Sequence, residues 1–354
     1  MSLLEDLGLS VPIIQAPMAG VSTPKMAAAV SNAGALGSIG VGAADALGTL
    51  RMIEETRSAT NHAFHVNVFV HAKAKQNPSL EKAWLEELRP QFDRFSVNPP
   101  DDIKVIYKSV DEDEEKFKVL LEQAPPVVSF HFGLPGQNKV NALKAAGCTL
   151  LSTATNLSEA REAENVGIDA LIAQGYEAGG HRGMFDPNAK DECLGTLALT
   201  RLLAVKSSLP VIAAGGIMDG AGINAVMELG AVAAQLGTAF IACPESSADN
   251  GYRNALSNAD DTGTTMTSAI SGRPARCLVN KFTIWGDAVS QPIPDYPIAY
   301  DAGKALNVAA KSANEHGYGA QWAGQGAPLS RSMPAAELVS TLNAELQRAK
   351  NNRS

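Results

Sequence analysis

Residues 211–238, VIAAGGIMDGAGINAVMELGAVAAQLGT, contain the repeating unit that decides the fold. Two short apolar runs, Val211–Ala214 and Ala233–Leu236, each end in a turn that contains glycine. The Ala-rich stretch Gly220–Leu229 lies between them and has the apolar periodicity of a helix. A strand, a helix and a second strand in this order predict two parallel strands joined by a right-handed crossover.

The same unit recurs from the start of the chain. Six further apolar runs are mostly continuous, as expected for strands that helices cover; they are Ile13–Met18, Leu36–Val41, His65–Val70, Val127–Gly133, Thr149–Thr155 and Ala170–Gln174. Helices are expected between them, over Pro24–Ala33, Ala44–Arg57, Gln137–Ala146, Ser158–Val166 and Gly195–Val205. Eight such units predict an α/β fold, the (β/α)₈ TIM barrel.

Two segments interrupt this repeat. Residues 71–125, after the third strand, are charged and broken by prolines, and we expect them to add helices. Residues 242–354 follow the eighth strand and include the Pro-rich run Gln291–Pro297. We interpret both as elaborations of a single barrel domain over residues 1–354, although the length would also allow two domains.

Composition and charge limit the classes of function. Net charge is −8, from 29 basic and 37 acidic residues, so no long-range field attracts nucleic acid or anionic lipid. The longest apolar runs, such as Ala231–Cys243, are too short to span a bilayer, and the amino-terminal residues lack a signal-peptide pattern. The four cysteines are widely spaced and favour no metal site. We expect a cytoplasmic protein, and the sequence leaves a monomer and a homodimer both open.

Because barrel chemistry occurs where strands end, the polar residues there are the candidates. Around Pro17, small residues would let the backbone approach a flat ligand, although an ordinary turn explains them equally well. Asn67 lies within an apolar strand, where its amide must be satisfied by a heterocycle or by a neighbouring loop. His131 ends the fourth strand, and His181 follows the sixth in a glycine-rich loop. Imidazole titrates near neutrality, so His181 is the favoured proton acceptor, against a purely structural role.

The turns after the seventh and eighth strands predict an anion site. Gly215, Gly216, Gly237 and Thr238 stand where barrels of this type bind phosphate through backbone N–H groups. Further on, Tyr296, Tyr300 and Lys304 are spaced by four residues and would share one face of a helix. That face either closes over an anionic ligand or is an ordinary solvated face on the barrel rim.

Taken in order, these motifs resemble the nitronate monooxygenases, and class I of that family in particular. The matching stretches are Gln15–Val21, Asn67 in its strand, Ser129–Gly133, Gln174–Gly183, Ala213–Ile217 and Gln235–Thr238. The sequence Glu-Ala-Gly-Gly-His-Arg-Gly, residues 177–183, is the most specific of them.

The resemblance implies bound FMN and the oxidation of alkyl nitronates by O₂ to a carbonyl compound and nitrite. It suggests propionate 3-nitronate as the substrate and detoxification as the role. It implies that His181 is catalytic and that the substrate pocket contains His131, Tyr107, Tyr296, Tyr300 and Lys304. The expected FMN-binding residues are Ala16, Pro17, Met18, Asn67, Gln174, Gly179, Gly180, Ala214, Gly215, Gly216, Gln235, Leu236, Gly237 and Thr238.

Two other activities remain open at this point. Another FMN barrel with the same motifs, an NAD(P)H-using enoyl-[acyl carrier protein] reductase or quinone reductase, would be reduced rapidly by a nicotinamide. A barrel isomerase or aldolase for a phosphorylated substrate would bind no flavin.

Overall fold

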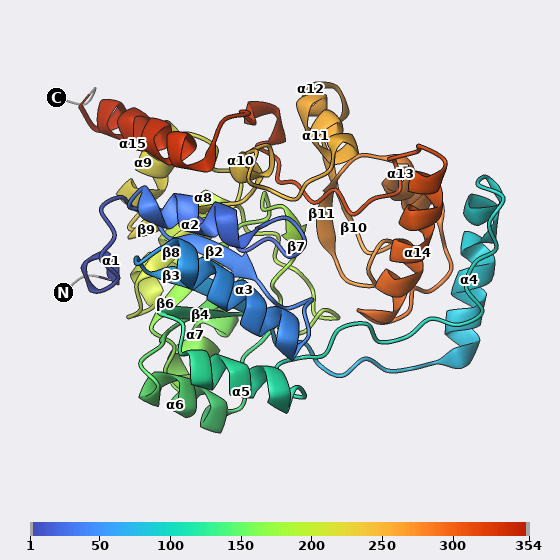
Figure 1. The fold of residues 1–354 in the computed structure, drawn as a ribbon, viewed down its shortest axis with the longest axis horizontal. Helices are drawn as coiled ribbons and strands as arrows, with labels where there is room; N and C mark the ends of the chain where they lie inside the picture. Colours follow the sequence, from blue (N-terminus) through green and yellow to red (C-terminus); the bar gives the residue numbers. More distant parts are fainter. Residues whose placement is uncertain (1–2, 352–354) are drawn as a thin grey trace.

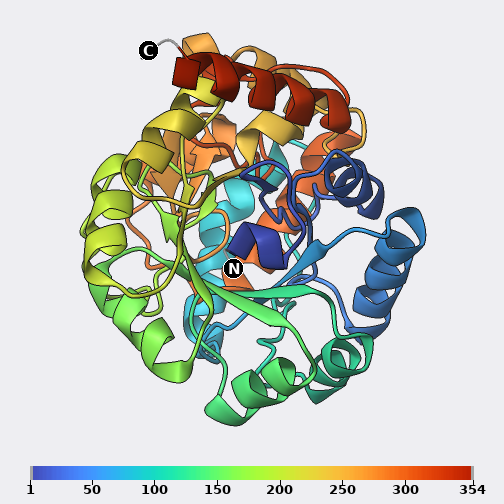
Figure 2. The ribbon, with the colours of Figure 1, turned by 90° about the vertical axis from the view of Figure 1, so that its left-hand side faces the viewer.

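Eight parallel strands close into a barrel in the computed structural model, which describes residues 3–351 (Figures 1 and 2). The strands are β1 (Ile13–Gln15), β2 (Gly37–Gly40), β3 (Phe64–Phe69), β4 (Val127–His131), β5 (Thr149–Ala154), β6 (Ala170–Gln174), β8 (Val211–Ala214) and β9 (Ala233–Leu236). They pair in the order β1-β9-β8-β6-β5-β4-β3-β2, and a parallel bridge between Ile14 and Leu36 joins the two ends. The predicted TIM barrel is therefore confirmed.

Eight helices form the outer layer. They are α2 (Pro24–Asn32), α3 (Ala46–Ala59), α5 (Glu114–Gln123), α6 (Gln137–Ala145), α7 (Leu157–Val166), α8 (Thr196–Lys206), α9 (Gly220–Glu228) and α15 (Ala335–Asn351). The carboxyl-terminal helix α15 packs between α9 and α2. It therefore supplies the eighth barrel helix, although residues 237–334 separate it from β9.

Local signals explain where the elements end. Asn156 caps α7, since its side chain accepts a hydrogen bond of 3.0 Å from the Glu159 N–H. Gly167 ends the same helix with a φ of 87°, a conformation that glycine adopts without strain. At the first strand, the expected range Ile13–Met18 is too long: β1 stops at Gln15, because Pro17 has no N–H to donate to a ladder.

The amino-terminal end of the barrel is closed by the start of the chain. Helix α1 (Leu3–Asp6) and the residues after it place Leu3, Leu4, Leu7 and Leu9 against the barrel interior. Figure 2 shows the amino terminus near the middle of the ring of helices. Across residues 3–351, no helix combines the length and the apolar character needed to cross a membrane.

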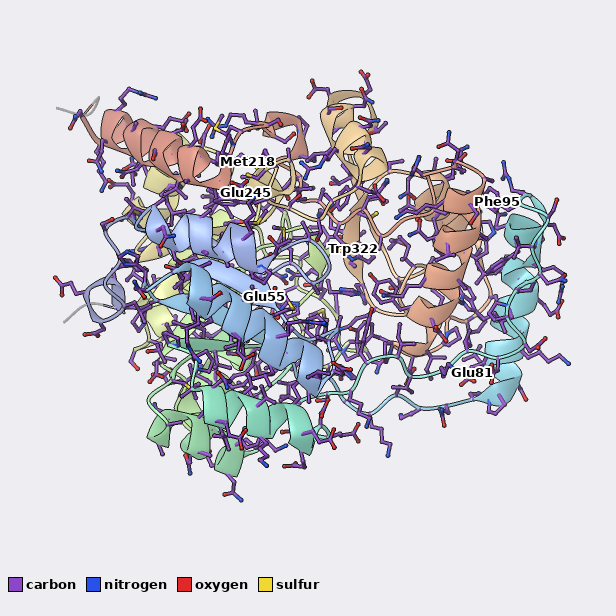
Figure 3. All side chains as sticks on the ribbon, viewed as in Figure 1. Glu55, Glu81, Phe95, Met218, Glu245 and Trp322 are labelled. Atoms are coloured by element: carbon purple, nitrogen blue, oxygen red, sulfur yellow. The ribbon has the colours of Figure 1, made fainter. Side chains whose placement is uncertain are left out.

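The other segments gather beyond the opposite end of the barrel. Helices α4 (Pro78–Asp93), α13 (Lys281–Ala288) and α14 (Ile298–Ser312) share a core that includes Trp84, Phe282 and Leu306. Phe95 packs on Tyr318 at its edge, with ring centroids 5.3 Å apart (Figure 3). Of the segment 71–125, α5 contacts α3 and α6 and is a barrel helix, so only the part around α4 is an insertion. The single-domain organisation stays a prediction.

A small antiparallel sheet links these helices to the barrel. It has the order β10 (Thr264–Thr267), β11 (Ala275–Leu278) and β7 (Gly180–His181), and β7 belongs to the loop after β6. Short helices α10 (Thr238–Ile241), α11 (Asn250–Ser257) and α12 (Ala259–Thr262) and the turn η1 (Ala327–Leu329) complete the segment before α15. The loop that carries His181 is thus paired with the carboxyl-terminal segment.

The close fit of α15 on α9 gives a first prediction. A Cβ atom added at Gly220 would overlap the backbone of Leu346 in α15, whereas one added at Gly222 would meet its nearest atom at 3.4 Å. Gly220→Ala should therefore lower the free energy of unfolding by about 1–3 kcal/mol, the usual cost of overpacking. Gly222→Ala, in the same helix, should be neutral or stabilising by roughly 0.5–1 kcal/mol. Urea unfolding of both variants tests this, and equal stabilities would mean that α15 is not docked in this way.

Candidate active site

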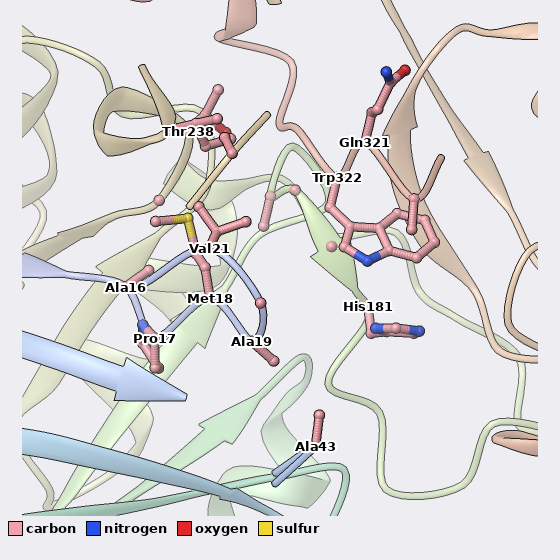
Figure 4. A pocket seen from close by; sticks show the side chains of 18 of the residues that line it. Ala16, Pro17, Met18, Ala19, Val21, Ala43, His181, Thr238, Gln321 and Trp322 are labelled. Carbon is pink, nitrogen blue, oxygen red and sulfur yellow. The ribbon is translucent and has the colours of Figure 1, made fainter. Parts of the chain in front are cut away.

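A cavity of about 440 Å³ lies between the strand ends of the barrel and the carboxyl-terminal segment. Figure 4 shows Ala16 to Val21 on one side of it and His181, Gln321 and Trp322 on the other. Nearly all of the predicted site residues line it. Leu236 is the exception, because its side chain packs in the core and its carbonyl accepts the Ala16 N–H. The loops after β1, β3, β4, β6, β8 and β9 therefore do meet at one mouth.

The turn after β1 is held by a buried glutamine. The Gln15 amide donates to Ser22 Oγ at 2.8 Å and accepts from the Ser38 N–H at 2.8 Å. Ser22 Oγ in turn accepts from the Met18 N–H at 2.9 Å. These bonds hold the turn on itself and on the neighbouring strand β2, so Pro17 and Met18 border the cavity as a fixed wall.

Asn67 borders the cavity with its side-chain amide oxygen, Oδ1. Its Nδ2 donates to Ser129 Oγ at 2.7 Å and to the Ser129 carbonyl at 3.3 Å. A backbone carbonyl can only accept, so the nitrogen must be on that side and Oδ1 on the other. Ser129 Oγ also contacts His65 Nε2 at 2.5 Å, in a fully buried group. A ligand that meets Asn67 Oδ1 must therefore offer a hydrogen-bond donor.

The glycine-rich loop after β6 is shaped by Gln174 and Arg182. Gln174 Nε2 donates to the His181 carbonyl at 2.9 Å, and Gln174 Oε1 accepts from the Gly183 N–H at 2.7 Å. Arg182 is 1% exposed and forms a bidentate ion pair with Asp191, with Nε–Oδ2 and Nη2–Oδ1 distances of 2.8 and 2.9 Å. Gln174 thus borders the cavity while its hydrogen bonds serve the loop, and Arg182 is structural.

His181 stands in an aromatic cage. Its ring centroid lies 5.1 Å from that of Trp322, 5.3 Å from Tyr296 and 5.6 Å from Phe132. Desolvation lowers the pKa of His181 well below its usual value, and the neighbouring His131 imidazole and the Arg273 cation oppose its protonation further. The imidazole is therefore unprotonated near neutral pH, which leaves one ring nitrogen with a lone pair.

His131 has no free nitrogen. Its Nε2 lies 3.2 Å from the His181 carbonyl and its Nδ1 lies 3.0 Å from Thr153 Oγ1. Since a carbonyl only accepts, Nε2 carries the hydrogen and Nδ1 accepts from the threonine hydroxyl. Burial lowers the pKa of His131 to about 3. His131 can fix the loop and border the substrate, but it is poorly placed to be a base.

The glycine turns leave backbone donors and an amide oxygen unused. Gly215 and Gly216 have φ values of 128° and 67°, which only glycine adopts freely. Within residues 3–351, the N–H groups of Gly216 and Gly237 donate to no protein acceptor. Gln235 Oε1 is buried and has no partner there either. Buried polar groups are rarely left unpaired, so this side of the cavity fits an anionic ligand with additional hydrogen-bonding groups.

Three tyrosines and a lysine form the opposite wall. Lys304 Nζ lies 5.2 Å from the Tyr107 ring centroid and 5.5 Å from that of Tyr300, and it makes no ion pair within the described chain. Burial raises the pKa of Tyr107 to about 12, and it also raises those of Tyr296 and Tyr300. Tyr296 precedes α14 rather than lying on it, yet its ring is 6.5 Å from that of Tyr300. The cluster is therefore an array of neutral phenols around one cation.

The sequence analysis missed several residues of the site. Ser271 contacts His181, Arg273 stacks over Phe132 with 4.1 Å between Cζ and the ring centroid, and Trp322 covers the imidazole. A Ser-Gly-Arg turn at residues 271–273 was a visible signal, but its partners are distant in the sequence. Nothing in the sequence around Trp322 marks it as a site residue.

Comparison with known proteins gives consistent results. The family model described as nitronate monooxygenase matches residues 2–345. A nitronate monooxygenase of Paraburkholderia phytofirmans is 57% identical over 98% of this chain and 95% of its own length. A solved nitroalkane oxidase from Streptomyces ansochromogenes is 40% identical with a TM-score of 0.91, over 100% of both chains. FabK from Thermotoga maritima is less similar, at 28% identity and a TM-score of 0.75 over 99% of this chain and 97% of its own.

Proposed function

The chain belongs to the nitronate monooxygenase family, and we propose that it oxidises small anionic alkyl nitronates with O₂ to a carbonyl compound and nitrite, with propionate 3-nitronate as its physiological substrate. We propose an anionic substrate because of the position of Lys304. Its ammonium group borders the cavity beside two phenols and forms no ion pair within residues 3–351, although the Asp301 carboxylate favours its charged form. In an acidic chain, such an unpaired cation supplies the local attraction that the overall charge does not.

Family membership implies a flavin, and we propose FMN. A volume of about 440 Å³ is within the range of roughly 300–1,000 Å³ usual for cofactor and ligand sites. The free N–H groups of Gly216 and Gly237 suit its phosphate. The Asn67 carbonyl oxygen and the orphan Gln235 Oε1 suit donors of a heterocycle. Ala16, Pro17 and Met18 would lie along one side of it.

When bound, the flavin supplies the electron acceptor for the nitronate and the route by which electrons reach O₂. The residues of the chain would bind the substrate, exclude water and, for some substrates, accept a proton. Lys304 and the phenols of Tyr107, Tyr296 and Tyr300 would hold the anion, and the aromatic cage around His181 would keep water away. A nitronate has already lost its α-proton, so its oxidation needs no base. For a neutral nitroalkane, His181 would accept that proton.

The direct test of this function is nitrite release with O₂ consumption when propionate 3-nitronate is added to the FMN-loaded protein. If the protein turned over no nitronate but its flavin were reduced rapidly by NADH or NADPH, the reductase alternative would replace the proposal. A protein that purified without flavin and took up no added FMN would favour a non-redox barrel enzyme.

Gly216 provides a test of the phosphate site. The variant Gly216→Asp places a side chain and a negative charge beside the free N–H groups, and we expect it to lose most of its FMN. Flavin content of the purified protein measures this. The same change at Gly136, where an added Cβ meets nothing within 4 Å, is the control and should leave FMN content unchanged. A folded Gly216→Asp protein with normal FMN would exclude this phosphate site.

Lys304→Met tests how the carboxylate is held. Loss of one cation should raise KM for propionate 3-nitronate by roughly 10- to 150-fold, since a hydrogen bond to a charged group contributes about 1.5–3 kcal/mol. KM for ethyl nitronate, which has no carboxylate, should rise much less. Steady-state kinetics with both substrates separates the cases. Equal increases would show that Lys304 does not contact the carboxylate.

His181→Asn tests the proton acceptor. Asn keeps polarity and approximate size but accepts no proton near neutral pH, so activity on nitroethane should fall by ~10²–10⁴. Activity on ethyl nitronate should fall far less, and FMN should be retained. His131→Asn is the matched comparison and should affect both substrates alike, because neither His131 nitrogen is free. Equal losses in His181→Asn would mean that His181 positions substrate or stabilises charge instead.

A further inference from the structure

The turn at residues 271–273 packs against the catalytic region from the carboxyl-terminal segment. Ser271 is fully buried. Gly272 has a φ of 86°, and a Cβ there would overlap the backbone of the Pro294–Tyr296 segment. The turn is therefore held firmly against the segment that carries Tyr296, and Ser271 has one fixed position.

Ser271 contacts two groups of different character. Its Oγ lies 2.9 Å from His181 Nε2 and 3.2 Å from the Arg273 carbonyl oxygen. The hydroxyl has one hydrogen, and the Arg273 carbonyl can only accept and has no other donor within residues 3–351, so we assign the hydroxyl hydrogen to that carbonyl. Ser271 Oγ then offers a lone pair to His181. With this assignment, the hydrogen of the imidazole is on Nε2.

This assignment determines what the other nitrogen does. A neutral imidazole has one N–H, so Nδ1 of His181 carries the free lone pair. Nδ1 makes no hydrogen bond within the described chain, and His181 borders the cavity. The groups around the His181 ring are mostly neutral, since His131 is an unprotonated imidazole and Tyr296 and Tyr300 are neutral phenols. The one nearby cation, Arg273, opposes a second proton on His181.

We propose that Ser271 is a positioning residue that fixes His181 as its Nε2–H tautomer and so presents Nδ1 to the cavity as the proton acceptor for neutral nitroalkanes. The proposal rests on the proposed function and adds a residue to it. In the step, the α-carbon–hydrogen bond breaks and its electron pair enters the C=N bond of the nitronate. The proton forms a bond to Nδ1, and the resulting imidazolium keeps its Nε2–H bond to Ser271 Oγ. An aspartate that orients a catalytic histidine acts by the same principle.

The tautomer can be measured directly. Protein labelled with ¹⁵N-histidine contains six histidines, and the His181→Asn variant identifies the resonances of His181. We expect a protonated, pyrrole-like Nε2 and an unprotonated, pyridine-like Nδ1 at neutral pH. The opposite pattern, or protonation of both nitrogens, would overturn the proposal. This measurement needs no substrate, so it stands or fails separately from the proposed function.

Variants test the consequence for activity. Ser271→Ala removes the acceptor and should lower kcat/KM for nitroethane by about tenfold, the effect of one hydrogen bond, while kcat/KM for ethyl nitronate changes little. Ser271→Thr keeps the hydroxyl and should restore the wild-type ratio of the two activities. Ser268→Ala is the matched control, because Ser268 lies just before this turn and, within residues 3–351, only its backbone carbonyl is hydrogen-bonded to the turn.

FMN content and the ¹⁵N spectrum of Ser271→Ala complete the test. We expect normal FMN and a mixture of the two His181 tautomers. A Ser271→Ala protein that kept the pure Nε2–H tautomer, or lost both activities equally, would overturn the role of Ser271. If wild type oxidised no nitronate but showed the expected tautomer, the proposed function would fail while the assignment of Ser271 held.

Discussion

The carbonyl group of His181 is the point on which the site depends. It accepts hydrogen bonds from Gln174 Nε2 and His131 Nε2, at 2.9 and 3.2 Å, so two barrel strands hold the backbone of the loop after β6. The same backbone forms β7 and pairs with β11, which ties the carboxyl-terminal segment to the barrel. Because buried amide and imidazole donors are costly to leave unpaired, this arrangement fixes the imidazole relative to both walls of the cavity.

Much of this could be predicted from the sequence, for local reasons. The ranges Ala170–Gln174, Val211–Ala214 and Ala233–Leu236 agree with β6, β8 and β9, since continuous apolar runs ending in glycine turns are strong local signals. The roles of Ser271 and Trp322 could not be predicted, because both depend on contacts with His181, which is distant in sequence. Sequence also cannot separate side chains that face a ligand from those that shape the loop: Arg182 lies next to His181 but is paired with Asp191.

Electrostatics explains how an acidic chain can hold an anion. The chain has a net charge of −8, but the part of the cavity around His181 contains neutral imidazoles and phenols, with Lys304 beside them. The other charges that line the cavity, Lys311 and Asp249, form an ion pair at 2.6 Å. Arg273, 3% exposed, lies behind Phe132. Desolvation keeps His131 and His181 unprotonated, so in the proposed function Lys304 and Arg273 would supply positive potential while His181 keeps a lone pair. In the proposed function, one set of residues would therefore attract the substrate and another would accept the proton.

The central claim, that this barrel binds FMN and oxidises nitronates, is tested most directly by one absorbance experiment. The FMN-loaded protein is mixed with propionate 3-nitronate without O₂, and the flavin bands are followed before and after air is admitted. The account predicts that the oxidised-flavin bands bleach on mixing and return with O₂, with release of nitrite. Bands that the nitronate leaves unchanged but NADH or NADPH bleaches rapidly would contradict it.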